Sequence, residues 1–351
     1  MAASAHARTL GIAGAACCLL TLAAVLLDPA AALRGWLAAA AFCTGAPIGA
    51  VLLVMMMRLI PGAWAGALMP AAEALTLLLP LAALALLPVL AGLGAIYPWA
   101  DGAPLNGFQA GYLTPWFFTL RTIAWFAALT GLAVLLLARR RASAPIACAG
   151  LVICILFGAV IAVDWVLSLD PSFHASGFGL YWLSVQMTVA LATAIILAPD
   201  PPPDRRPVLA GLLLTAILLW AYLAFMQYVI LWSGNLPPGV RWYDSRSGPG
   251  WAELLWAVAL LHLAPTLLLM LPWMRESARA VRWLATPVLL GKALECAWLV
   301  LPGSAPVDIR IGGPAFALAA AGIGLLLRAT YPAAAAWHGR IGREARTGEA
   351  S

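Results

Sequence analysis

Apolar segments of about twenty residues recur along this 351-residue chain, separated by short polar breaks. An α-helix of about 20 residues crosses the roughly 30 Å hydrocarbon core of a bilayer, so each segment is long enough for one membrane span. Hydrophobic residues make up 64% of the chain and charged residues only 10%. A soluble domain carries about 25% charged residues. Because the sequence also lacks the short alternating segments of a membrane barrel, it predicts an all-α integral membrane protein.

Charges, prolines and interfacial aromatic residues mark where the spans begin and end. They predict ten transmembrane helices, at roughly 8–27, 35–57, 67–95, 113–138, 145–169, 176–198, 208–232, 252–273, 280–301 and 312–330. The first segment has the basic start and apolar run of a signal peptide as well. Its apolar run is long for a signal peptide, so a retained membrane anchor is favoured.

Basic residues are unevenly distributed over the two sides that ten spans create. One side carries Arg8, Arg58, Arg139, Arg140, Arg141, Arg205, Arg206, Arg275, Arg279, Arg282, Arg328, Arg340, Arg343 and Arg346. The other side carries only Arg34, Arg241, Arg246 and Arg310. Because cytoplasmic loops are enriched in Lys and Arg, this asymmetry predicts that both termini are cytoplasmic. The net charge of +6 follows from this topology, and no nucleic-acid partner is expected.

Two long breaks with similar features lie four spans apart. The first is YPWADGAPLNGFQAGYLTPW (97–116) and the second is FMQYVILWSGNLPPGVRWYDSRSGPGW (225–251). Each begins with an aromatic residue at a helix end and finishes with a tryptophan. A shift of four spans preserves orientation, so the pattern predicts two tandem four-helix bundles, at 35–170 and 171–303. A peripheral helix in 1–34 and a last helix and tail in 304–351 complete the organisation.

Four motifs occur in a fixed order along the chain. They are WAGALMPAAEALTLLLPLAALALLPVLAGLGAIYPWA (64–100), YLTPWFFTLR (112–121), DWVLSLDPSFHASGFGLYWL (164–183) and AFMQYVILWSGNLPPGVRWYDSR (224–246). In this combination the chain resembles the ActF family, membrane subunits of bacterial alternative complex III. The segment GKALECAWLVLPG (291–303) is also similar to the ninth span of that family.

The resemblance implies the tandem-bundle architecture of the NrfD and PsrC superfamily, in a multi-pass protein of the bacterial inner membrane. It implies a quinol-oxidising respiratory complex whose other members are a related quinol-binding subunit, an iron–sulfur subunit and a multihaem cytochrome. Lipid is the remaining expected partner. A subunit of this kind is expected to bind no cofactor itself, because quinol, haem and iron–sulfur centres belong to the partner subunits.

Residues that could hold a cofactor are sparse. A transmembrane haem needs two axial ligands from facing helices, and His262 is the only histidine deep in a predicted span. The six cysteines form no CxxC motif, and His, Cys and carboxylate residues show no metal-ligand spacing. The sequence therefore predicts neither haem nor metal in this chain.

Ionisable residues within the predicted spans need an explanation, because each costs on the order of 2.5–3.5 kcal/mol unless it is paired or solvated. They are Glu73, Arg121, Asp164, His262, Lys292 and Glu295. Ordered by depth, they predict a staggered path for protons across the bilayer.

Structural roles are the alternative for most of these residues. Lys292 and Glu295 share a helix face at i, i+3 and can form an ion pair that fixes packing. His262 can bond between helices, Arg121 can cap a helix end, and Asp164 can pair near the membrane surface. Glu73 has no basic partner at helical spacing, which favours a functional role.

The sequence thus predicts a non-catalytic subunit that scaffolds a quinol-oxidising complex and conducts protons. Alternatively, the chain itself binds and oxidises quinol, with Asp164 and His174 as the nearest proton acceptors. A secondary transporter is the third interpretation, although the sequence shows no inverted repeat and no two broken helices at matching positions.

The break after the seventh span is the predicted docking loop for subunits outside the membrane. Its polar and aromatic residues are Asn235, Arg241, Trp242, Asp244 and Arg246. They follow a helix end marked by prolines, on the side poor in positive charge.

Overall fold

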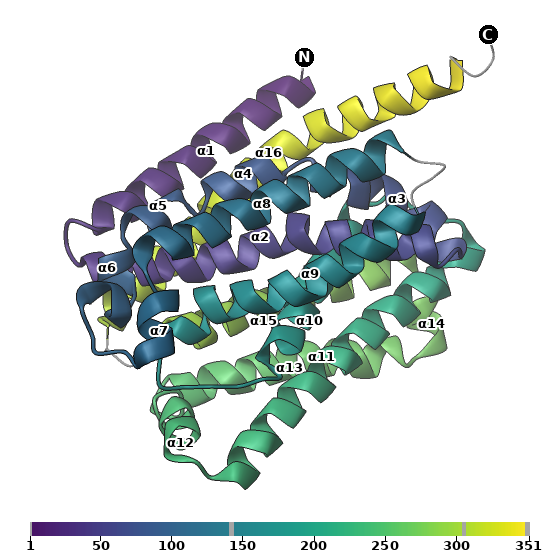
Figure 1. The fold of residues 1–351 in the computed structure, drawn as a ribbon. Helices are drawn as coiled ribbons and strands as arrows, with labels where there is room; N and C mark the ends of the chain where they lie inside the picture. Colours follow the sequence, from purple (N-terminus) through teal and green to yellow (C-terminus); the bar gives the residue numbers. More distant parts are fainter. Residues whose placement is uncertain (1, 140–143, 304–306, 348–351) are drawn as a thin grey trace.

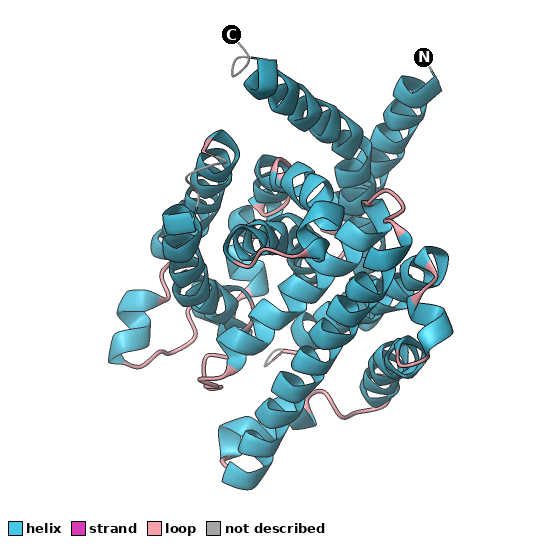
Figure 2. Cartoon of the chain, turned by 90° about the vertical axis from the view of Figure 1, so that its right-hand side faces the viewer, coloured by secondary structure: helices cyan, strands magenta, loops and turns pink. Residues whose placement is uncertain are grey.

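The computed structural model describes residues 2–139, 144–303 and 307–347. All regular secondary structure in these ranges is helical, as Figure 2 shows by colour. The all-α fold class is confirmed.

Nine helices in the described ranges are long and apolar enough to cross a membrane. They are α1 (Ala2–Ala24), α2 (Pro29–Leu59), α8 (Pro115–Ala138), α9 (Ala144–Trp165), α10 (Phe178–Leu197), α11 (Arg206–Gly234), α13 (Trp251–Leu269), α15 (Ala278–Val300) and α16 (Ile309–Thr347). A bent pair made of α3 (Ala63–Thr76) and the pieces α4 (Leu79–Leu84) and α5 (Leu87–Ala91) passes the same test when taken together and is counted as the tenth span; α6 (Leu93–Ile96) follows it. The chain is a multi-pass membrane protein with the predicted set of spans.

The third span is broken, whereas the sequence suggested one helix over 67–95. It bends by 46° between α3 and α4, and Pro80 and Pro88 begin the pieces that follow. Proline has no backbone N–H, so each break frees carbonyl oxygens that lipid cannot satisfy. The Trp36 indole on α2 donates to one of them, the Ala85 oxygen, at 2.7 Å. The second break, between α4 and α5, is therefore held by a hydrogen bond from the neighbouring span.

Taken in chain order, the spans fall into two groups of four that correspond to the predicted bundles, and Figure 1 shows α2 in the middle of the molecule, where it contacts spans of both groups. The first group holds α2, the broken span, α8 and α9, and the second holds α10, α11, α13 and α15. The groups meet where α2 packs on α10. A Cβ added at Gly49 would lie 2.4 Å from the Gln186 oxygen, so only glycine permits this approach.

The first and last spans lie outside both groups. α1 and α16 run side by side along α2, and Gly14 and Gly322 bring their backbones together. A Cβ at Gly35 on α2 would lie 2.6 Å from the Gly312 oxygen on α16. Small residues therefore determine these close contacts, as is usual between helices in lipid.

The two ends of the bundle differ. In Figure 1, α1 begins and α16 ends at the end of the bundle that carries α14 (Pro272–Arg275), here called the α14 end. The other end carries η1 (Pro98–Asp101), α7 (Gly107–Tyr112) and α12 (Pro237–Asp244), and is called the α12 end. Short η2 (Leu167–Leu169) and η3 (Pro203–Arg205) complete the connections. α12 replaces the irregular loop expected after the seventh span.

Candidate functional site

Glu73, the first residue of the predicted proton path, is paired after all. Its carboxylate is buried on α3 and forms an ion pair with Arg58 on α2. The Thr76 hydroxyl donates to the Glu73 backbone oxygen at 2.7 Å, at the turn where the span bends. The basic partner comes from the preceding helix, and spacing within α3 could not reveal it.

Arg121 and Asp164 form a second ion pair, between α8 and α9. Arg121 Nε lies 2.6 Å from Asp164 Oδ2, and Nη2 lies 3.0 Å from Oδ1. The rings of Tyr112 and Phe117 stand over the guanidinium, at 3.9 and 4.2 Å from its central carbon. Asp164 is fully buried and lies one residue before α9 ends at Trp165. Both carboxylate oxygens are occupied by one rigid, two-pronged donor.

His174, the other predicted quinol contact, is exposed on the connection between α9 and α10. Its Nδ1 lies 3.0 Å from the Ser172 oxygen, and its Nε2 lies 3.4 Å from the Gln109 side chain. Asp164 faces Arg121 inside the first group, as described above. The structure does not bring Asp164 and His174 together at one cavity.

Glu295 lies at the centre of a third cluster, inside the second group. Its Oε1 accepts hydrogen bonds from the Tyr181 hydroxyl and from Trp220 Nε1, the latter at 2.7 Å. Its Oε2 accepts from Lys292 Nζ at 2.9 Å, as the i, i+3 spacing predicted. Lys292 Nζ also stands 3.4 Å from the centre of the Trp220 ring. Three helices, α10, α11 and α15, therefore converge on one buried carboxylate.

His262 on α13 lies beside this cluster. Its ring stacks on Trp220 with 4.1 Å between centroids, and Gly291 leaves room for it. His262 Nδ1 lies 2.7 Å from the Val258 oxygen, which can only accept, so Nδ1 carries a hydrogen. Within the described residues, Nε2 has no hydrogen-bond partner. The imidazole thus presents an unused acceptor next to the Lys292–Glu295 pair.

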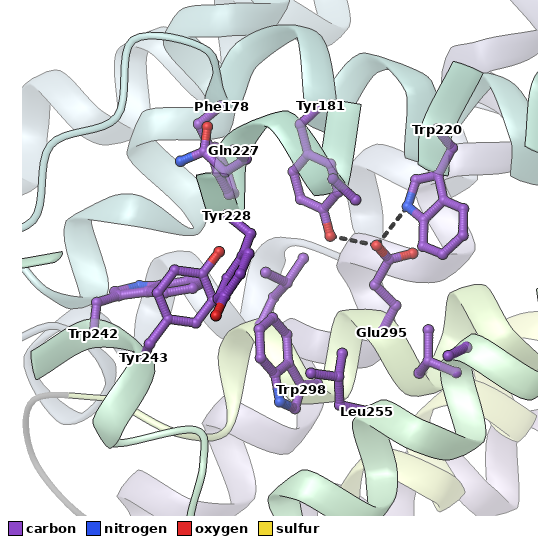
Figure 3. Close-up of a pocket in the computed structure, with 14 residues that line it drawn as sticks. Phe178, Tyr181, Trp220, Gln227, Tyr228, Trp242, Tyr243, Leu255, Glu295 and Trp298 are labelled. Atoms are coloured by element: carbon purple, nitrogen blue, oxygen red, sulfur yellow. Dashed lines mark hydrogen bonds between the residues drawn. The ribbon is translucent and has the colours of Figure 1, made fainter. Parts of the chain in front are cut away.

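A cavity of about 220 Å³ extends from Glu295 toward the α12 end (Figure 3). Its lining is almost wholly apolar or aromatic, with Tyr181, Trp220 and Glu295 together at one end of the view and Tyr228 and Tyr243 toward the other. The remaining lining residues are Phe178, Ala224, Gln227, Trp242, Leu255, Val258, Ala259, Trp298 and Leu299. Glu295 is the only acid among these lining residues.

The mouth of the cavity opens on the side of the helix bundle and not at one of its two ends. The exposed lining residues are Tyr228 on α11 and Leu255 and Ala259 on α13, so the opening lies between these two spans. α12 covers the end of the cavity through Trp242, whose ring stacks on Phe173 with 4.7 Å between centroids. A ligand would therefore enter from the lipid side, between α11 and α13.

The predicted docking loop is only partly a free surface. Asn235, Arg241 and Asp244 are exposed, and Asn235 ends α11 with a positive φ of 46°. Trp242 and Arg246 are buried, so these two members of the predicted docking loop do not belong to its free surface. The rings of Trp242 and Tyr243, which line the cavity, pack against each other, and Trp242 also packs against Trp298.

Arg246 closes the end of α15. Its guanidinium donates to the oxygens of Trp242, Leu299 and Pro302 at 2.9, 2.9 and 2.7 Å, and it lies 3.9 Å from the centre of the Trp242 ring. Burial lowers the pKa of this guanidinium, and Asp170 and Tyr243 act in the opposite direction. Arg246 thereby ties α12 to the span that carries Glu295.

Sequence reasoning missed Tyr181 and Trp220 as functional residues. In the sequence they resemble the other aromatic residues of the spans, and only their common contact with Glu295 distinguishes them. Groups of three or more His, Cys, Asp or Glu that could hold a metal are absent from the described residues. No family model matches the chain, and no curated protein is similar enough to count as a match.

Proposed function

We propose that this chain is an integral membrane subunit of a quinol-oxidising respiratory complex of the alternative complex III type, and that it holds a quinol or quinone ring beside Glu295. The ordered sequence motifs and the two groups of four spans support the first part. One observation carries the second part: a buried carboxylate with three donors stands at the inner end of an aromatic cavity that opens to lipid.

The size and lining of the cavity suit a single ring. Pockets for drug-sized ligands measure roughly 300–1,000 Å³, so about 220 Å³ accommodates a substituted ring with its isoprenoid tail outside. Phe178, Tyr243 and Trp298 offer aromatic faces, which favour offset or edge contacts with another ring. The tail would pass between α11 and α13 into the bilayer.

The polar atoms at the inner end suit both forms of the ligand. A quinol hydroxyl can donate to the Glu295 carboxylate, and the Tyr181 hydroxyl, whose one hydrogen is donated to Glu295 here, would turn from Glu295 to donate to a quinone oxygen. Glu295 would then accept the proton of the hydroxyl beside it, and the proton of the second hydroxyl, at the other end of the ring, would be released to water at the α12 end. The two electrons would pass to a redox centre of a partner subunit, which fits the expected iron–sulfur and multihaem partners.

Titration with a short-chain quinone tests this proposal. Trp220, Trp242 and Trp298 line the cavity, so saturable quenching of tryptophan fluorescence reports binding in the purified protein. Ala224→Phe fills the cavity and should weaken binding at least tenfold. Ala221→Phe, one turn away on the exposed face of α11, is the matched control and should bind normally. Absence of saturable binding, or equal binding by both variants, would sink the proposal.

Proton conduction without quinol binding is the second candidate. The observation that favours it is the unpartnered Nε2 of His262 beside the buried Lys292–Glu295 pair. The pairs of Glu73 and Asp164 lie in other helices, so water would have to connect the three clusters. In the reconstituted complex, quinol oxidation is measured together with the pH change. Glu73→Gln and Glu295→Gln should both reduce proton movement; unaltered proton movement in both variants excludes a path through these residues.

Secondary transport is not supported by a specific feature of the fold. Transporters place broken helices at corresponding positions of two halves. The broken span of the first group corresponds to α11 in the second, and α11 runs as a single helix from Arg206 to Gly234.

Complex membership and orientation are tested in the native membrane. We expect iron–sulfur and multihaem subunits to co-purify with the chain, and the exposed Arg241 and Asp244 at the α12 end to be their docking surface. We also expect both termini in the cytoplasm of a bacterial inner membrane, since basic residues cluster at the α14 end. Purification of the chain without any redox subunit would contradict this membership.

A further inference from the structure

A second cavity lies on another face of the bundle, away from Glu295. It is a groove of about 270 Å³ between α2, α3, α10, α15 and α16, with an apolar floor that includes Leu75, Val189 and Leu327. At one end of its lining stand Arg328 and Tyr331, one turn apart on α16. Of the described residues that line the groove, Arg328 alone carries a charge.

The charged end of the groove lies at a membrane boundary. α16 begins at the α12 end with Ile309, and Arg328 is about 29 Å further along the helix axis, close to the roughly 30 Å of the hydrocarbon core. Leu75, Phe42 and Val189 lie deeper in their spans. The groove thus combines an apolar trough inside the bilayer with a cation and a hydroxyl at its α14 end.

We propose that this groove binds a phospholipid with an anionic headgroup. One acyl chain lies in the apolar trough, and the phosphate accepts hydrogen bonds from the Arg328 guanidinium and the Tyr331 hydroxyl. An acyl chain gains little by leaving the bilayer, since lipid tails are as apolar as the groove. Selection therefore depends on the headgroup, and the uncompensated positive charge of the lining favours an anionic lipid over a zwitterionic one.

Gly324 provides a way to fill the groove without disturbing the fold. It lines the groove on α16, and a Cβ added there meets nothing within 4 Å. Gly324→Leu therefore occupies the trough and also improves helix propensity. Arg328→Gln removes the charge and leaves the trough open. Arg279→Gln is the matched control, because Arg279 is exposed on α15 and outside the groove.

Native mass spectrometry of the purified protein, with the partner subunits it retains, measures the lipid bound. Phosphatidylglycerol and phosphatidylethanolamine with identical chains are added at equal concentration. We expect about five-fold more retained phosphatidylglycerol, the preference that one arginine near the surface provides. Arg328→Gln should abolish the preference, Gly324→Leu should abolish retention of both lipids, and Arg279→Gln should match the unmodified protein.

Three results would overturn the inference. Equal retention of the two lipids would show that the headgroup does not determine which lipid binds. An equal loss in Arg328→Gln and Arg279→Gln would assign the preference to the general charge of this end. Retention that survives Gly324→Leu would place the lipid elsewhere. None of these readouts depends on quinone binding, so this inference and the proposed function fail independently.

Discussion

The two groups of four spans each bury one acid on their last span, and the surroundings of the two acids differ. Asp164 on α9 is held by both prongs of Arg121 from the adjacent helix, and aromatic rings stand over the guanidinium. Glu295 on α15 shares its oxygens among a lysine on its own helix and two neutral donors, Tyr181 and Trp220. Only Glu295 lines the aromatic cavity.

This difference indicates that the Arg121–Asp164 pair stabilises helix packing, whereas the surroundings of Glu295 form a candidate binding site. In the first group the charge of the acid is compensated by an opposite charge on a neighbouring helix, which locks α8 to α9. In the second group the compensating lysine comes from the same helix, so the ion pair joins no two helices. The neutral donors of the second site place a carboxylate where a ligand can reach it. We therefore expect mutations at the first acid to change stability and mutations at the second to change binding.

Breaking the Arg121–Asp164 pair should have the largest effect on the fold. Arg121→Leu leaves the fully buried Asp164 without its charge partner, which costs about 3–5 kcal/mol of unfolding free energy. Thermal unfolding in detergent measures this change. The double variant Arg121→Leu with Asp164→Leu should recover most of the loss, because an apolar replacement of both partners is often neutral. A double variant no more stable than the single one would show that the pair is not the cause.

Removing the charge of Glu295 should affect ring binding most strongly. Glu295→Gln replaces a charged acceptor, whose hydrogen bonds contribute about 1.5–3 kcal/mol, so quinone affinity should fall by roughly 10- to 100-fold. The fluorescence titration described above measures it. His174→Gln is the control, because His174 is exposed and outside the cavity. If His174→Gln lowered quinone affinity as much as Glu295→Gln, the quinone would bind at the connection between α9 and α10 and not at Glu295.

Tyr181→Phe should cause a smaller loss. It removes one hydroxyl donor to Glu295 and keeps the ring, so about 0.5–1.5 kcal/mol of binding free energy is lost. The same titration should show a two- to ten-fold weaker affinity. Tyr222→Phe is the control, since Tyr222 is exposed on α11 and does not line the cavity. An unchanged affinity in Tyr181→Phe would mean that the ring does not approach the inner end.

His262→Phe should have the smallest effect. An aromatic ring is kept on Trp220, and the hydrogen bond from Nδ1 to the Val258 oxygen is lost, which costs about 0.5–1.5 kcal/mol of unfolding free energy. Quinone affinity should not change, because His262 does not line the cavity. Proton movement in the reconstituted complex separates the two candidate functions: a large decrease would favour conduction through His262, and no decrease would favour ring binding alone.

Much of the architecture could be predicted because lipid imposes a simple rule on the sequence. A helix must be about 20 apolar residues long, so the ends of the spans are marked locally, and α8, α10 and α15 begin and end within two residues of the predicted bounds. The Lys292–Glu295 pair was also foreseeable, since i, i+3 residues share a helix face.

The candidate site required the tertiary structure. Glu73 and Arg58 are 15 residues apart, Arg121 and Asp164 are 43 apart, and Tyr181 and Glu295 are 114 apart. Such contacts depend on which helix faces pack together, and nearly uniform apolar spans carry almost no periodic signal for that. Residue types and spacing alone thus predicted a ten-span membrane protein with six ionisable side chains within its spans. Helix packing, set at close glycine contacts such as that of Gly49 on α2 with Gln186 on α10, decided which of them are locked in ion pairs and which one faces a cavity.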